Sequence, residues 1–314
     1  MKNIFKLLLL ALFVLPVSLL KANGPGTKDP IEGRWDLTVN MDGRIAPSWL
    51  EVRHTGVNGY FGRFVADGGS ARPISKVEFK DGKISFHIPA QWERTDKELV
   101  VEGTLVDGKL SGTMVSTSGK TYTWVGEPAP KLWREKAPKW GAPIKLFNGK
   151  DLTGWQALGK TNQWIVESGV LKSPKSGANI RTEKTFDDFK LHIEFRYPKG
   201  SNSGVYLRGR YEIQIEDNKG KEPMSLYLGG IYGFIDPWLN MAKEAGEWQS
   251  YDVELVGRMV TVKVNGTTVI YKQEIPGVTG GALDSKEGEP GPIMMQGDHG
   301  PIEFRNIVLT PAVN

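Results

Sequence analysis

The chain has 314 residues and a formal net charge of +4, and its length accommodates two domains of ordinary size. Three of its lysines lie within residues 1–22, a segment that contains no acidic residue. Without that segment, basic and acidic residues nearly balance, which argues against a general nucleic-acid binder because such a protein needs a concentrated basic face. The chain has no cysteine, so it has no disulfide and no thiol for a lipid anchor.

Residues 1–22 have the pattern of a secretory signal peptide. Lys2 and Lys6 precede the apolar run LLLLALFVLPVSLL, and small residues follow it, which predicts cleavage near Ala22 or Gly24. A membrane span is the alternative, but the run is short and Pro16 interrupts it. We therefore expect a periplasmic or secreted protein.

Residues 30–127 consist of short segments of alternating apolar and polar side chains, separated by turn signals. Asp81-Gly82 and Asp107-Gly108 are typical of two-residue hairpin turns. The pattern predicts a small antiparallel domain of about eight strands, closed as a barrel or folded as a sandwich. Its opening GRW, at residues 33–35, weakly resembles the start of a lipocalin-like barrel.

Residues 128–143 are expected to form a linker. Four prolines keep this segment extended. Trp133 and Trp140 are expected to pack on a domain surface, with an aromatic ligand site as the alternative.

Residues 144–314 contain a second series of alternating segments, which predicts an antiparallel sandwich of two sheets. Only residues 236–248 have a short helical character. The expected fold class is therefore all-β, a sandwich preceded by a smaller antiparallel domain.

Strand alternation predicts a polar sheet face in this second domain. Successive side chains of a strand point to opposite faces, so neighbouring strands would bring six polar side chains together. A solvated outer face is the alternative, since such faces are polar in any sandwich. The mixture of carboxylates, an amide, an arginine and a tyrosine nevertheless suits sugar hydroxyls. The predicted face consists of Glu194, Tyr206, Arg208, Glu212, Gln214 and Glu216.

Several motifs of the second domain occur in the order found in a known family. They include LFNGKDLTGW (146–155), GSNSGVYLRG (200–209), YEIQIED (211–217) and QGDHGPIEFRNI (296–307). The domain resembles the 3-keto-disaccharide hydrolase family. This resemblance implies a concanavalin A-like jelly roll and action on glycosides whose glucose ring carries a ketone at carbon 3. Members often have Q-D-H-G where this chain has an additional Gly297, which is expected to shift the turn slightly.

Such a substrate requires a base near carbon 2 and a donor at the enolate oxygen. Together with the resemblance, the face assignment makes Glu212 or Glu194 the base and Arg208 or a protonated His299 the donor. Binding roles are expected for eight further residues. These are Asn202, Tyr206, Gln214, Asp217, Tyr232, Trp238, Gln296 and Asp298.

A divalent metal could replace the arginine, with ligands from Glu194, Glu212, Asp217 and His299, although no tight ligand spacing is present. Two other functions are considered. One is an ordinary retaining glycosidase, which needs two carboxyl groups roughly 5–5.5 Å apart. The other is a non-catalytic glycan-binding protein. Because the chain has no dinucleotide fingerprint, a separate oxidoreductase is expected to supply the ketone.

Overall fold

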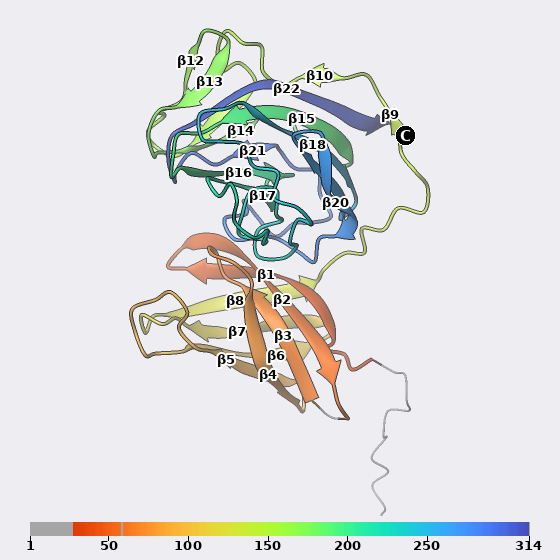
Figure 1. Cartoon of the computed structure of the whole chain (residues 1–314). Coiled ribbons are helices and arrows are strands. Elements are labelled where there is room, and N and C mark those ends of the chain that lie inside the picture. The colour runs from red at the N-terminus through yellow and green to blue at the C-terminus, as the bar shows by residue number, and fades with distance from the viewer. Residues whose placement is uncertain (1–27, 58, 314) are drawn as a thin grey trace, which may run out of the picture. The chain divides into compact units, whose positions relative to one another are not determined.

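The computed structural model describes residues 28–57 and 59–313 (Figure 1). The predicted signal peptide, residues 1–22, lies outside them. Every regular element in the described part of the chain is a β-strand, which confirms the all-β prediction. Among the described residues, no helix has the length and apolar character needed to cross a membrane.

The first strands of the described chain form a closed antiparallel barrel. At two of its hairpins, Asp81 and Asp107 have positive φ angles of 50° and each precedes a glycine, as two-residue turns of this type require. Alternate apolar side chains of the strands fill the barrel interior. The strands are β1 (Gly33–Met41), β2 (Arg44–Thr55), β3 (Gly59–Val65), β4 (Arg72–Lys80), β5 (Lys83–Ile88), β6 (Leu99–Val106), β7 (Lys109–Val115) and β8 (Thr121–Pro128).

The remaining described strands form two antiparallel sheets. The larger sheet has the order β12 (Ile165–Glu167), β13 (Val170–Ser173), β22 (Ile302–Val313), β15 (Phe189–Arg196), β18 (Gln249–Val256), β19 (Met259–Val264), β20 (Thr267–Glu274). The short strands β9 (Lys139–Trp140) and β10 (Ile144–Lys145) also pair with β22. The smaller sheet has the order β11 (Trp155–Leu158), β14 (Asn179–Thr182), β21 (Met294–Met295), β16 (Asn202–Leu207), β17 (Tyr211–Glu216).

The facing sides of the two sheets form one continuous apolar core. From the larger sheet, Ile193 and Phe195 are fully buried, and from the smaller sheet Val205 and Ile213 are fully buried. Burial of such a side chain stabilises the fold by roughly 1.5–3 kcal/mol. Because alternate residues of β16 and β17 point into this core, the residues between them point to the opposite face of the smaller sheet.

The short helix predicted for residues 236–248 is wrong, because this segment is irregular. Its backbone donors bind side chains instead of forming helical hydrogen bonds. The N–H of Ala242 donates to Asn240 Oδ1 at 3.0 Å, and the N–H of Lys243 donates to Gln249 Oε1 at 2.9 Å. Local side-chain acceptors of this kind compete with a helix.

The linker tryptophans differ in their surroundings. The ring of Trp140 lies 4.6 Å from the ammonium of Lys190, as expected for a residue packed on the sandwich. Trp133 is 71% exposed, so the prediction that it packs on a surface is wrong. The barrel and the sheets lie in one compact unit, Ile31–Asn314.

Candidate functional site

The β16–β17 hairpin carries the polar face predicted from alternation. Tyr206 pairs with Glu212, and Gly204 pairs with Gln214. All four lie on the side of the sheet that faces away from the apolar core. A side-chain carbon on Gly204 would lie 2.2 Å from Glu212 Oε1. Only glycine therefore leaves room for the carboxyl group of Glu212 above β16.

Glu212 is the central titratable group of this face. Its side chain is buried, and Tyr206 donates its hydroxyl proton to Oε2 at 2.9 Å. Burial raises the pKa of Glu212 to about 8. The Tyr206 hydrogen bond and the charge of His299 lower this pKa, and the charge of Asp298 raises it. A carboxyl group with a pKa near neutrality is suited to proton transfer.

Residues 296–301 form a turn that is held by two serines, one on β16 and one just before it. Ser203 donates its hydroxyl proton to the carbonyl of Gln296 at 2.8 Å, and Ser201 donates to the carbonyl of Pro301 at 2.6 Å. Asp298 and His299 therefore lie beside the hairpin that carries Glu212.

Asp298 and His299 form a close pair, with 2.6 Å between Asp298 Oδ1 and His299 Nδ1. The hydrogen bond from Asp298 raises the pKa of His299, burial opposes that effect, and the charges of Asp298 and Glu212 add to it. The imidazolium form is therefore favoured relative to a free histidine.

The additional Gly297 is held tightly. Its N–H donates to Asn179 Oδ1 at 2.8 Å, and its carbonyl accepts from the N–H of Gly177 at 2.8 Å. A side-chain carbon here would lie 2.4 Å from the carbonyl oxygen of Ala178 and 2.8 Å from the ring of Trp164. Gly297 thus determines where the following Asp298 and His299 lie.

We expect Gly297→Ala to lower activity without unfolding the protein. The new methyl group must displace the turn that carries Asp298 and His299, and a displacement of about 1 Å can cost up to about 10²-fold in rate. Steady-state kinetics would measure the loss. Gly288→Ala is the control, because its φ is not positive and its methyl group would meet Pro130 only at ordinary contact distance. Equal kinetics for both variants would contradict the expectation.

Two of three further predicted residues, Tyr232 and Gln296, lie near Glu212, whereas Asn202 lies four strand positions away from it. The N–H of Tyr232 donates to the carbonyl of Glu212 at 3.0 Å. The pKa of Tyr232 is raised, mainly by burial and to a smaller extent by the charge of Glu212. Asn202 is half-buried on β16, opposite Glu216. Gln296 is buried, and its N–H donates to the carbonyl of Gly204 at 2.9 Å. Its Oε1 has no hydrogen-bond partner among the described residues.

The predicted placement of Glu194 beside Glu212 is wrong. Glu194 lies on β15, which pairs with β18 and β22 of the larger sheet. Its carboxylate accepts hydrogen bonds from Arg305 at 2.6 Å and Asn306 at 2.8 Å. These partners lower its pKa, although burial opposes them. Alternation assigned the face within the strand but not the sheet to which the strand belongs.

The predicted placement of Arg208 on this face is also wrong. The chain leaves β16 at Arg208 with a positive φ of 52°, so the alternation that began with Tyr206 ends there. The guanidinium is fully buried and donates to Tyr211 Oη at 3.1 Å and to the carbonyl of Gly257 at 2.9 Å. It also pairs with Asp187 at 3.1 Å.

Asp217 and Trp238 lie apart from Glu212. Asp217 Oδ2 accepts from the N–H of Gly200 at 2.8 Å, which gives this carboxylate a role in the turn before β16. Trp238 is 58% exposed, and its N–H donates to Val269 of β20 at 2.8 Å. The predicted roles of both in sugar binding therefore have no support from their positions.

The metal ligands considered from the sequence do not converge. Glu194 belongs to the other sheet and Asp217 is engaged with Gly200. Within the described residues, no group of three His, Cys, Asp or Glu side chains is arranged to hold a metal ion. The four predicted ligands thus do not fit a common divalent ion.

The family assignment rests on residues 142–310, which match the family model described as "3-keto-alpha-glucoside-1,2-lyase-like domain". The match covers more than half of the chain. The chain belongs to the 3-keto-alpha-glucoside-1,2-lyase-like family. This membership confirms the family predicted for the second domain, and the predicted enzyme class of glycoside hydrolase or lyase agrees with it.

Individual proteins are similar over shorter stretches. A "3-keto-disaccharide hydrolase" from Bacteroides thetaiotaomicron is 29% identical over 91 residues, which are 25% of this chain and 31% of that protein. The chain thus spans about a third of this curated relative. Two solved structures of candidate glycosyl hydrolases from Parabacteroides distasonis are 30% and 25% identical. They cover 56% and 54% of this chain and 93% and 98% of their own chains, with TM-scores of 0.45 and 0.42.

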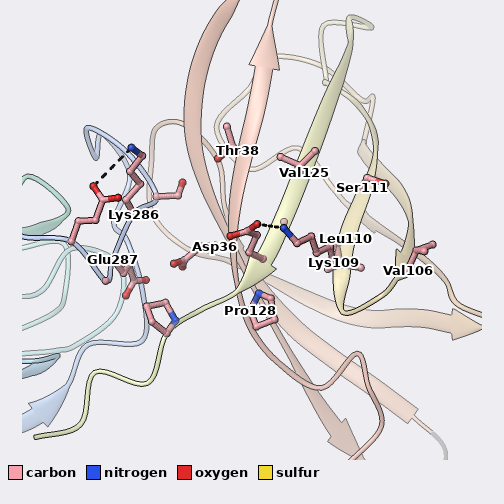
Figure 2. Close-up of a pocket in the computed structure, with 16 residues that line it drawn as sticks. Asp36, Thr38, Val106, Lys109, Leu110, Ser111, Val125, Pro128, Lys286 and Glu287 are labelled. Carbon is pink, nitrogen blue, oxygen red and sulfur yellow. Dashed lines mark hydrogen bonds and ion pairs between the residues drawn. The ribbon is translucent and has the colours of Figure 1, made fainter.

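The structure of this family member also contains a cleft that the sequence did not predict. The cleft has a volume of about 840 Å³. Barrel residues, Pro130 of the linker and residues 285–289 of a sandwich loop line it (Figure 2). None of the predicted site residues lines it. On its barrel side lies Asp36, whose pKa is raised to about 9 by burial and then by the neighbouring Glu287. Glu287 is fully buried and pairs with Arg258 at 2.8 Å.

We expect Asp36→Asn to improve stability at alkaline pH. A carboxyl group whose folded pKa lies above its unfolded value stabilises the fold fully below the unfolded pKa, near 4. That contribution is lost as the pH rises through about 9. An amide does not ionise, so the melting temperature of the variant should fall less between pH 6 and 10. Glu127→Gln removes an exposed carboxyl group of the same cleft, and its melting temperature should change with pH as that of wild type does. If both variants resist alkaline pH equally, the raised pKa of Asp36 is not the cause.

Proposed function

We propose that the protein cleaves 3-keto-glucosides or 3-keto-disaccharides by elimination at carbon 1 followed by hydration. The observation that carries the proposal is the arrangement around Glu212. A buried carboxyl group with a pKa near neutrality lies on the same sheet face as Tyr206 and within electrostatic reach of the His299–Asp298 pair. Family membership supports the same substrate class.

The reaction begins with loss of a proton. The ketone at carbon 3 acidifies the hydrogen on carbon 2, and the ionised Glu212 removes it. The electron pair forms an enolate with its charge on the oxygen of carbon 3. The enolate then expels the group on carbon 1, which leaves with the electrons of its bond and takes up a proton. Water adds across the resulting enone, which gives the free 3-keto sugar and completes a net hydrolysis.

His299 is proposed as the donor that stabilises the enolate. Asp298 holds Nδ1, so the other ring nitrogen is available for a substrate oxygen. An imidazolium cation that is already in place stabilises developing negative charge without reorganising. Tyr232, Asn202, Gln214 and Gln296 are proposed to orient the sugar from the surrounding face.

An ordinary retaining glycosidase is less well supported. Such an enzyme needs two carboxyl groups roughly 5–5.5 Å apart. Glu212 and Glu216 occupy the same face of β17, but four residues separate them by roughly 13 Å along a strand. Asp298 is the other carboxylate near Glu212, and it is engaged with His299.

One pair of substrates distinguishes the proposed function from its alternatives. The protein would be incubated with a 3-keto-glucoside and with the matching unoxidised glucoside. Cleavage of the ketone alone, through a transient enone that absorbs ultraviolet light, supports the proposal. Cleavage of the plain glucoside would support the retaining glycosidase, and binding without cleavage would support a glycan-binding protein.

We also propose that the protein is exported and works with a separate oxidoreductase. The pattern of residues 1–22 supports export into the periplasm or the medium. The absence of a dinucleotide fingerprint in the sequence supports a separate supplier of the ketone. Comparing the N-terminus of the mature protein with the gene product would test export.

A further inference from the structure

Two loops contact Glu212 from outside its own hairpin. In the first, residues 231–235, the N–H of Tyr232 donates to the carbonyl of Glu212. In the second, residues 279–281, Thr279 Oγ1 accepts from the N–H of Glu212 at 3.0 Å. The same second loop covers the hydroxyl group of Tyr206, because a side-chain carbon on Gly281 would lie 2.6 Å from that oxygen.

The Tyr206 hydroxyl has one proton and two acceptors. It lies 2.9 Å from Glu212 Oε2 and 3.0 Å from the carbonyl oxygen of Gly280. When Glu212 is ionised, the hydroxyl donates to the carboxylate. When Glu212 has taken up a proton, its own O–H can donate to Tyr206 while Tyr206 donates to Gly280. The carbonyl of Gly280 is therefore the acceptor that the protonated state of Glu212 requires.

The barrel contacts this backbone directly. A side-chain carbon on Gly280 would lie 2.1 Å from the carbonyl oxygen of Gly69, which belongs to the loop between β3 and β4. The N–H of Gly281 donates to the carbonyl of Asp67 in that loop at 3.1 Å. The absence of a side chain at Gly280 is what lets the backbone of Gly69 approach so closely.

The same barrel loop also contacts the first loop, and an apolar cluster lies behind both. A side-chain carbon on Gly233 would lie 2.8 Å from the backbone nitrogen of Ala71. The rings of Trp49 on the barrel and Phe234 on the sandwich lie 5.2 Å apart, nearly perpendicular. Four buried residues from the two parts form the centre of this cluster, namely Trp49, Val65, Val278 and Ala282.

We propose that the barrel is a positioning element of the site. Its β3–β4 loop fixes the backbone of residues 279–281, and this backbone supplies the acceptor that Tyr206 needs when it exchanges a proton with Glu212. The barrel thereby keeps water away from Glu212 and holds the alternative acceptor for Tyr206. This inference rests on the proposed function only in treating Glu212 as the base. It gives the first domain a role beyond packing.

The proton affinity of Glu212 also depends on the groups that face it. Tyr206 faces it from β16, Tyr232 from the first loop, and the Asp298–His299 pair from the turn after β21. Tyr251 of the larger sheet interacts with it through the core. None of these groups lies in the barrel or in residues 279–281, so a variant of the Gly69–Gly280 contact removes none of their charges.

The test variant is Gly280→Ala in the full chain, since its methyl group must push the second loop away from Gly69. In protein labelled with ¹³C-glutamate, the carboxyl resonance of Glu212 would be assigned by its absence in Glu212→Gln and followed during a pH titration. Water entering beside Glu212 should increase its acid ionisation constant by about tenfold or more, so that it titrates at a lower pH. The acidic limb of kcat/KM should move in the same direction.

Gly288→Ala is the matched control, because it lies in the same long loop and its methyl group would meet Pro130 only at ordinary contact distance. Equal midpoints in Gly280→Ala, Gly288→Ala and wild type would overturn the proposal. If Gly280→Ala does not fold, Trp49→Leu loosens the same contact from the barrel side and is judged by the same titration. A shifted midpoint in a protein that cleaves no 3-keto-glucoside would refute the proposed function, and with it the role of Glu212 as base, but would still show that the barrel contact controls the proton affinity of Glu212.

Discussion

Replacing Glu212 by glutamine is expected to lower kcat/KM for a 3-keto-glucoside by about 10²–10⁴-fold, the usual contribution of a general base. The amide keeps the shape of the side chain but cannot accept the carbon 2 proton. In wild type, kcat/KM should rise with pH through about 8, because burial raises the pKa of Glu212 to that value and only the carboxylate is active. Activity that instead falls through pH 8 would make Glu212 an acid.

Two controls separate this loss from damage to the fold. Glu194→Gln changes a carboxylate of the other sheet and should retain nearly full activity. The melting temperature supplies the second control. The neutral form of Glu212 stabilises the fold, and this contribution is lost as the pH rises through about 8. Glu212→Gln should therefore be at least as stable as wild type at pH 9 while being far less active.

Replacing His299 by alanine is expected to cost about 10²–10³-fold in kcat, the range for loss of one donor to a developing oxyanion. The variant should also change the pH profile. The charge of His299 lowers the pKa of Glu212, so its removal should move the acidic limb of kcat/KM to higher pH. Steady-state kinetics between pH 5 and 10 would measure both effects.

Asp298→Asn is the matched comparison for His299→Ala. Asp298→Asn removes a charge that raises the pKa of Glu212, and it also removes the hydrogen bond that raises the pKa of His299. The two effects on Glu212 oppose each other, because a His299 that is less often protonated no longer lowers the pKa of Glu212. Asp298→Asn should therefore move the acidic limb upward by less than His299→Ala does, and an equal or larger upward shift would contradict the assignment of the shift to these two charges.

Local features of the sequence were sufficient to predict much of the secondary structure of this protein. Alternation and the Asp-Gly turns predicted an all-β chain because period two and hairpin turns depend on residues that are close in sequence. Alternation also assigned Tyr206, Glu212 and Gln214 to one face, since all three lie on strands joined by a short turn. The helix predicted at residues 236–248 was wrong because nearby side chains, those of Asn240 and Gln249, accept the hydrogen bonds of its backbone N–H groups.

The cleft beside Asp36 had no signal in the sequence. Asp36 lies on a barrel strand and Glu287 on a sandwich loop, and nothing in either segment indicates that the two meet. The contact between Gly69 and Gly280 is similar in this respect. Glycine allows two backbones to approach each other. The position of a glycine in the sequence, however, does not indicate which other segment of the chain will contact it.

The sequence by itself determined the strands, the face of each side chain within a strand, and the motifs that identify the family. Only the tertiary structure decided that Glu194 and Glu212 belong to different sheets, that Arg208 leaves the polar face, and that His299 lies near Glu212. The physical reason is the range of each interaction. Alternation depends on the local geometry of one strand, whereas neighbours in a sheet and the burial that raises the pKa of Glu212 depend on segments that fold together from distant parts of the chain.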